Sequence, residues 1–128
     1  MSDMVSTAFG SLAMMTSVLV SPQGCYEYEA AHGTVTNHYY RHLKGEKTST
    51  NPIATIFTWT GALNKRGELD GNEALCAFAK KLEQACLDTI DSGIMTGDLA
   101  LLAEGEDVRT VDTAAFISAI RGMLEATL

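Results

Sequence analysis

An apolar stripe at helical spacing runs through the middle of the chain. Side chains three and four positions apart lie on one face of a helix, so this stripe predicts a long amphipathic helix that starts near Asp70 and is stopped by Gly93. One face of that helix needs other elements to cover it. The members of the stripe are Leu75, Phe78, Ala79, Leu82, Cys86, Thr89 and Ile90.

A second helix is predicted directly before it. Asn51 or Thr50 can cap a helix that has Pro52 at its first position, and Gly67 is expected to end it. Its apolar positions also recur at helical spacing. They are Ile53, Ile56, Phe57, Thr60 and Leu63.

The N-terminal part predicts a β-hairpin. The segments Thr16–Val20 and Cys25–Glu29 flank Ser21-Pro22-Gln23-Gly24, in which proline second and glycine fourth suit a type I turn. Glu27 and Glu29 alternate with two tyrosines, which is typical of a strand with one wet face and one packed face. Before the hairpin, residues 3–10 are interpreted as the tail of a helix.

Two shorter elements complete the pattern. Thr96 can cap a short helix through Leu102, and a loop at Gly105-Glu106-Asp107 precedes a last helix. That helix is defined by Phe116, Ile117, Ile120, Met123 and Leu124. The sum is an α/β chain, rich in helix, with one hairpin and about four helices. A lone hairpin is rarely stable, which indicates that part of its sheet is missing.

Composition narrows the class of protein. A chain of 128 residues with 46% hydrophobic content fits one domain with a packed core. A formal charge of −7 disfavours nucleic acid and anionic membrane as partners. The apolar run from Phe9 to Val20 is too short to span a bilayer. Cys25, Cys76 and Cys86 include no close-spaced pair, so free thiols in a reducing, cytoplasmic compartment are expected.

The residues best suited to binding lie in a polar segment that contains all three histidines and precedes the helix predicted at Pro52. A loop from Gly33 to His38, closed by that helix start, can bind an anion such as phosphate; an ordinary polar surface loop is the alternative. His38 and His42 lie four apart and could share a helical face as metal ligands, but no third ligand is near. No catalytic constellation is found, so no catalytic residue is assigned.

Several longer motifs resemble one family. They are Glu29-Ala30-Ala31-His32-Gly33-Thr34-Val35-Thr36, Thr48-Ser49-Thr50-Asn51-Pro52-Ile53-Ala54 and Ser92-Gly93-x-Met95-Thr96-x-Asp98-Leu99-Ala100. Together they are similar to NADP-dependent isocitrate dehydrogenases of the dimeric, eukaryotic-like type, within the isocitrate/isopropylmalate dehydrogenase family. The resemblance covers nearly everything from Asp3 to Ala100.

The resemblance implies that residues 1–128 are a single partial domain, the helix-rich C-terminal part of the large domain of that fold. The implied activity is that of a tricarboxylic acid cycle oxidoreductase, a homodimer that converts isocitrate to 2-oxoglutarate and reduces NADP with Mg²⁺ or Mn²⁺. The substrate clamp and the catalytic tyrosine and lysine have no counterpart here, so the 128-residue chain alone is expected to be inactive. Asp3 is the implied metal ligand. The implied cofactor residues are His32, Gly33, Thr34, Val35, Thr36, Asn37, His38, Thr50 and Asn51.

One position departs from the family pattern. NADP enzymes of this family carry arginine where this chain has Asn37, and that arginine grips the 2′-phosphate together with the following histidine, here His38. A neutral amide supplies no charge, so NADP is favoured less strongly and NAD is possible. Arg41 could compensate if the loop turned it inward. The alternative to the enzyme is a non-catalytic nucleotide-binding or oligomer-forming chain.

Overall fold

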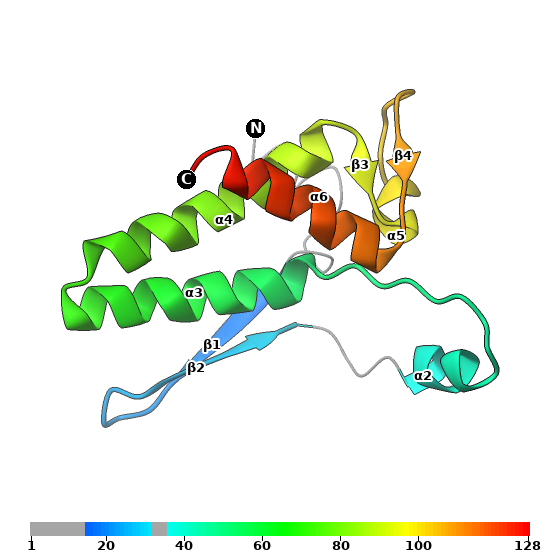
Figure 1. Cartoon of the computed structure of the whole chain (residues 1–128). Coiled ribbons are helices and arrows are strands. Elements are labelled where there is room, and N and C mark those ends of the chain that lie inside the picture. Colours follow the sequence, from blue (N-terminus) through cyan, green and yellow to red (C-terminus); the bar gives the residue numbers. More distant parts are fainter. Residues whose placement is uncertain (1–14, 32–35) are drawn as a thin grey trace.

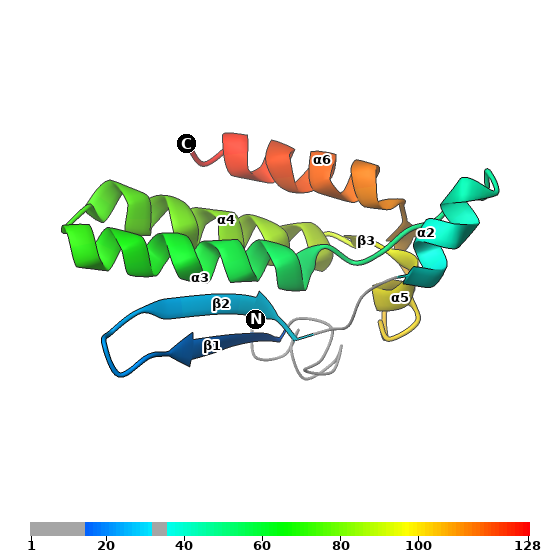
Figure 2. The same cartoon turned by 90° about the horizontal axis from the view of Figure 1, so that it is seen from below.

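The computed structural model describes residues 15–31 and 36–128. Within that part, a β-hairpin, two long antiparallel helices and a C-terminal helix are stacked one on another (Figures 1 and 2). The hairpin lies on α3, α3 packs on α4, and α4 packs on α6. The predicted class, α/β and rich in helix, is confirmed.

The predicted hairpin is confirmed, although its second strand lies one residue later than the predicted Cys25–Glu29. Strand β1 (Thr16–Val20) pairs antiparallel with β2 (Tyr26–Ala30), and Val20 lies opposite Tyr26. The Ser21 carbonyl accepts a hydrogen bond from the Gly24 N–H at 3.0 Å, as a turn with Pro22 at its second position requires. The Tyr28 ring lies against α3 at Gly61, while Glu27 and Glu29 are exposed, so the predicted wet and packed faces are confirmed.

Helices α3 (Ile53–Asp70) and α4 (Glu73–Asp91) form a tight helical hairpin. The prediction that Gly67 ends the first helix is wrong, since α3 continues to Asp70. The end comes at Gly71, which adopts φ +65° while the Asn72 N–H donates to the Gly67 carbonyl at 2.8 Å. The predicted start of the second helix near Asp70 is wrong by the same few residues. Asn72 caps α4 instead, by accepting a hydrogen bond from the Leu75 N–H.

The C-terminal third contains elements that the sequence pattern only partly predicts. The expected short helix is α5 (Gly97–Ala100), which ends before the predicted Leu102. Thr96 precedes it, but the Thr96 hydroxyl donates to Asp98 Oδ1 at 2.6 Å and does not cap the helix. Asp112 caps α6 (Thr113–Glu125), the expected last helix. Two very short strands, β3 (Ile94–Met95) and β4 (Arg109–Thr110), pair in parallel and were not predicted.

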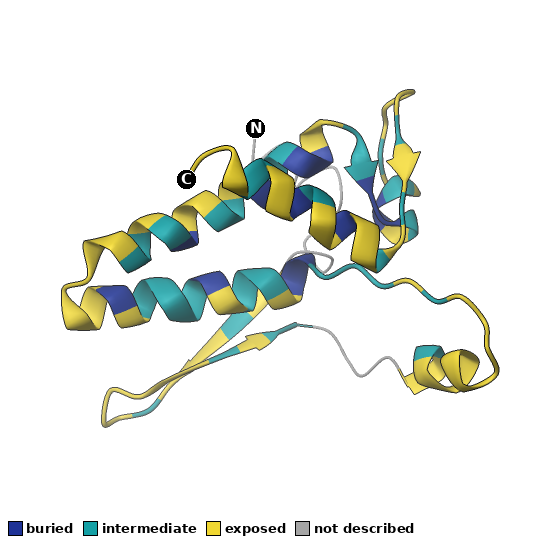
Figure 3. Cartoon of the chain, viewed as in Figure 1, coloured by how far each residue is buried: buried dark blue, intermediate teal, exposed yellow. Residues whose placement is uncertain are grey.

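The core lies where α3, α4, α5, α6 and β3 converge, and Figure 3 shows the buried residues gathered there. Dispersion and burial of apolar surface hold these elements together. The exposed side chains of α2 (Thr36–Leu43) lie outside this core, and α2 buries none of its residues. The core consists of Ile53, Ala85, Cys86, Ile90, Met95, Leu99, Phe116 and Ile120.

The described residues contain five helices, whereas about four were predicted. The additional helix is α2. The helix tail expected at residues 3–10 lies outside the described residues. Within 15–31 and 36–128, no helix combines the length and the hydropathy needed to cross a membrane.

Candidate functional site

The segment between α2 and α3, residues 47–51, is an extended strap held by the start of α6. The Thr50 N–H donates to Thr113 Oγ1 at 2.8 Å, and the Thr113 hydroxyl donates to the Thr50 carbonyl, also at 2.8 Å. Ser49 Oγ lies 3.3 Å from the same hydroxyl. Two distant parts of the chain therefore meet at one threonine side chain.

The end of the strap is held by α3. Asn51 Oδ1 accepts a hydrogen bond from the Ile53 N–H at 2.9 Å. The predicted cap is wrong by one position, because Pro52 itself occupies the N-cap of α3 and no side chain caps the helix there. Pro52 has no N–H to satisfy and stands immediately before the first residue of the helix. Ile53 itself is fully buried, which fixes the strap to the core.

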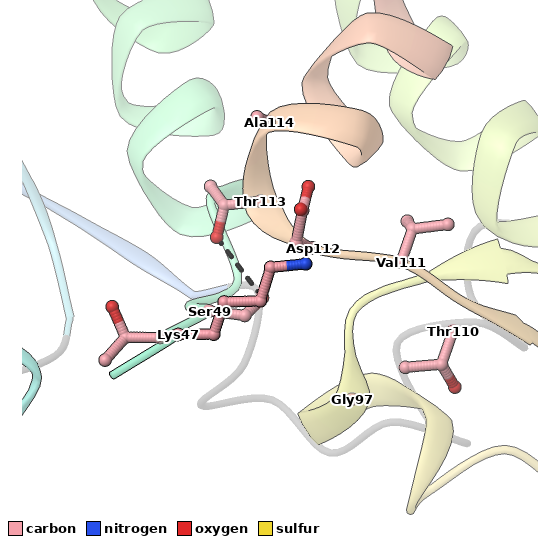
Figure 4. A pocket seen from close by; sticks show the side chains of 9 residues that line it. Lys47, Ser49, Gly97, Thr110, Val111, Asp112, Thr113 and Ala114 are labelled. Atoms are coloured by element: carbon pink, nitrogen blue, oxygen red, sulfur yellow. Dashed lines mark hydrogen bonds between the residues drawn. The ribbon is translucent and has the colours of Figure 1, made fainter. Parts of the chain in front are cut away.

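A pocket of about 530 Å³ opens beside the strap (Figure 4). Lys47, Thr48 and Ser49 line one side; Gly97 of α5 and Thr110 to Ala114 line the other. Hydroxyl groups, one ammonium and the Asp112 carboxylate give the pocket mixed polarity. Such a lining suits a neutral, hydroxyl-rich or heterocyclic group better than a compact anion, because Asp112 offsets the charge of Lys47.

Thr36, Asn37 and His38 form the first turn of α2. The prediction that the loop extends to His38 is therefore wrong for these three residues. Asn37 is exposed, while His38 Nδ1 is buried and has no hydrogen-bond partner among the residues that the structure describes. A buried ring nitrogen of this kind is well suited to receive a polar ligand group.

Arg41 pairs with a carboxylate just beyond the end of α2. Its Nε donates to the Glu46 carboxylate at 2.7 Å, and both side chains are about half exposed. Exposed pairs of this kind add little stability, so the pairing holds Arg41 only weakly.

The sequence profile of the isocitrate/isopropylmalate dehydrogenases matches residues 1–120. The chain belongs to this family.

Three relatives illustrate the relationship. An NADP isocitrate dehydrogenase from Sphingobium yanoikuyae is 53% identical over 99% of this chain and 31% of the relative. A mitochondrial NADP isocitrate dehydrogenase from Sus scrofa is 50% identical over 99% of this chain and 32% of its own length. A peroxisomal enzyme from Arabidopsis thaliana is 53% identical, with coverage of 99% and 32%. The chain thus spans about a third of the relatives it matches.

The other site residues implied by this family are only partly placed. Asp3 and the run His32, Gly33, Thr34 and Val35 lie outside the described residues. His38 and His42 do lie four apart on one helix, but the described residues contain no group of three histidine, cysteine, aspartate or glutamate side chains that could hold a metal ion. The possible metal site at these two histidines therefore gains no third ligand among the described residues.

Sequence reasoning missed Thr113 and Gly97 as neighbours of the strap. Asp112 can be recognised from the sequence, because aspartate is a preferred N-terminal cap of helices. In the structure its side chain accepts the Ala115 N–H at 2.8 Å. That signal places the start of α6. It does not reveal the contact of Thr113 with Thr50, which lies 63 residues earlier in the sequence.

Proposed function

We propose that this chain is the part of an NADP-dependent isocitrate dehydrogenase that holds the adenosine half of the cofactor. The observation that carries the proposal is 53% identity over 99% of the chain to an NADP isocitrate dehydrogenase. In the proposed site, Thr50 and Asn51 flank the adenosine. His38, with the run His32 to Asn37, takes the 2′-phosphate side.

Two features of the structure support this fit. The strap is held at Thr50 and at Asn51, beside a pocket of mixed polarity of about 530 Å³. The unpartnered His38 Nδ1 is buried on α2, at the other end of the same connecting segment. Pre-set polar groups lower the ordering cost of binding a nucleotide.

The proposed reaction of the intact enzyme is oxidative decarboxylation of isocitrate to 2-oxoglutarate and CO₂. NADP, when bound, accepts the hydride removed from the substrate. The residues of this chain bind and orient the cofactor, and none is assigned to catalysis. Mg²⁺ or Mn²⁺, with Asp3 as a ligand, belongs to the same proposal, but the described residues offer no metal cluster from which to derive a step.

Assembly and location are also proposals. Apolar side chains of β1, among them Val18, Leu19 and Val20, are exposed and favour association into a homo-oligomer. Cys25, Cys76 and Cys86 are all free, which fits a reducing compartment such as the cytoplasm. Relatives of this chain include mitochondrial and peroxisomal enzymes as well.

A chimera tests the proposed activity. Residues 1–128 would replace the matching segment of the Sphingobium yanoikuyae enzyme, and isocitrate-dependent formation of NADPH would be followed by absorbance. We expect turnover, with no reaction when isocitrate is omitted. A folded chimera that binds neither NADP nor NAD would contradict the proposal.

The chimera also separates the proposal from the non-catalytic alternative. Under both, a polypeptide of residues 1–128 alone should show no isocitrate oxidation, because groups that act as a unit fail together when some are missing. If the chimera binds nucleotide but does not turn over, the nucleotide-binding alternative is favoured. If the 128-residue polypeptide itself reduces NADP with isocitrate, the expectation of inactivity is wrong.

A further inference from the structure

Thr113 uses all the hydrogen-bonding capacity of its hydroxyl on the strap. A hydroxyl has one proton to donate and two lone pairs that accept. The proton goes to the Thr50 carbonyl, and one lone pair receives the Thr50 N–H. Since the proton is taken, Ser49 must donate in its contact with Thr113, which occupies the second lone pair (Figure 4).

None of these bonds serves α6 itself. The N-terminal cap of that helix comes from Asp112, which accepts the Ala115 N–H. Its anchorage comes from Phe116 and Ile120, both buried in the core. The Thr113 hydroxyl is therefore free to hold a different part of the chain.

Among the described residues, the strap is also held at Asn51, which accepts the Ile53 N–H. Without the Thr113 hydroxyl, the Thr50 N–H and carbonyl would both lose their hydrogen bonds to α6. The position of the strap relative to α6 would then be less strictly defined.

We infer that Thr113 is a positioning residue for the adenosine site, setting the place of Thr50 and Asn51 relative to the pocket beside α6. This inference rests on the proposed function. It makes the C-terminal helix a part of cofactor recognition, through the hold of its first residue on the strap.

The test compares three variants of the 128-residue chain. Thr113→Val keeps the shape of the side chain but removes the hydroxyl, and Thr113→Ser keeps the hydroxyl. Thr127→Val is the matched control, because it deletes a threonine hydroxyl that bonds only the Leu124 carbonyl at the opposite end of α6. Thermal unfolding would show that each variant retains its fold.

Two quantities would be measured. Calorimetry would measure the binding of adenosine 2′,5′-bisphosphate. Its affinity should weaken roughly tenfold in Thr113→Val, the size of effect expected when a net hydrogen-bond contribution is lost. It should stay near the wild-type value in Thr113→Ser and Thr127→Val. Hydrogen exchange of the Thr50 amide should accelerate in Thr113→Val alone.

The outcomes separate the two claims. If the wild-type chain binds and Thr113→Val binds equally well with a freely exchanging Thr50 amide, the positioning role is overturned and the proposed function stands. Weakened binding with no change in exchange at Thr50 would also overturn it, because the effect would not pass through the strap. A wild-type chain that does not bind adenosine 2′,5′-bisphosphate would contradict the proposed function, and the positioning role with it.

Discussion

Gly67 of α3 leaves room for the sulfur of Cys76 on α4. A Cβ built on Gly67 would stand 2.6 Å from Cys76 Sγ and 3.0 Å from the Asn72 carbonyl oxygen. Atoms in proteins do not approach so closely, so the two helices can pack at this distance only because residue 67 has no side chain. The same glycine is buried inside α3 and does not end it.

Gly67→Ala should therefore destabilise the chain by about 1–3 kcal/mol, since overpacking outweighs the gain in helix propensity. Gly122→Ala is the control, because a Cβ there meets nothing within 4 Å in exposed α6. It should be neutral or stabilise by up to about 1 kcal/mol. Chemical denaturation measures both. Equal effects would show that the contact with Cys76 does not limit the packing.

Asn51→Ala should lower the free energy of unfolding by about 0.5–2 kcal/mol, because the Ile53 N–H loses its acceptor. Asn51→Asp keeps an oxygen at the same place and should retain most of the stability. Denaturation curves for the two variants give the comparison. A loss of equal size in both would mean that Asn51 stabilises the chain through something other than its hydrogen bond with the Ile53 N–H.

Cys86 gives the stability a pH dependence. Burial, with the nearby Glu83 carboxylate adding to it, raises the pKa of the Cys86 thiol to about 12, from an ordinary value of 9.0. In the unfolded chain the thiol loses its proton first, so unfolding releases a proton in this range. The contribution of the Cys86 thiol to the free energy of unfolding is fully present below pH 9 and is lost as the pH rises toward 12.

The free energy of unfolding should fall by up to about 1.4 kcal/mol per pH unit in that interval. Cys86→Ala should have the shallower slope, whatever its overall stability. Cys25→Ala removes an exposed thiol and should keep the wild-type slope. Denaturation at a series of pH values measures the slopes, and identical slopes in all three proteins would contradict this assignment.

Asn37 sets the expected choice between NADP and NAD. In the chimera, Asn37→Arg should tighten NADP binding roughly ten- to a hundredfold through a charge-assisted hydrogen bond and leave NAD nearly unchanged. The exposed position of residue 37 on α2 accommodates the longer side chain. Titration of both nucleotides provides the measurement.

His38→Ala should weaken NADP selectively, because NAD has no 2′-phosphate to lose. Its unpartnered Nδ1 motivates the choice of this side chain. Equal changes for NAD and NADP in both variants would show that this segment does not recognise the 2′-phosphate.

Leu19 tests the proposed association of the hairpin. It is 57% exposed and lies opposite Glu27 across the strand pair. Leu19→Lys places opposite charges across the two strands and should shift the chain toward monomer without unfolding it. Leu69→Lys, at a position on α3 that is 58% exposed, is the matched control. Sedimentation velocity should show a change only for Leu19→Lys; the same shift in both would argue against the hairpin as the interface.

Local patterns predicted the elements whose signals are local. The hairpin turn and the apolar stripe of α4 depend on residues that are close together in sequence, and the structure confirms both. The end of α3 was predicted wrongly because a glycine inside a helix and a glycine after one look alike in sequence. Only the packing against Cys76 distinguishes them.

The candidate site was harder to predict for the same reason. The first turn of α2 was interpreted as loop because its residues have no buried face and thus no apolar stripe. The two-residue strands β3 and β4 are too short to show alternation. The contact between Thr50 and Thr113 joins residues 63 apart, and no spacing rule reaches that far.

The two-residue connection between α3 and α4 bears on the order in which the chain takes shape. Closing so short a loop costs little entropy, so this helical hairpin can assemble as soon as Asp91 has been synthesised. The strap, in contrast, waits for Thr113, which emerges 63 residues after Thr50. The strap is therefore fixed only after the start of α6 has been synthesised, and a chain interrupted before α6 would hold a well-formed helical hairpin but an unplaced strap.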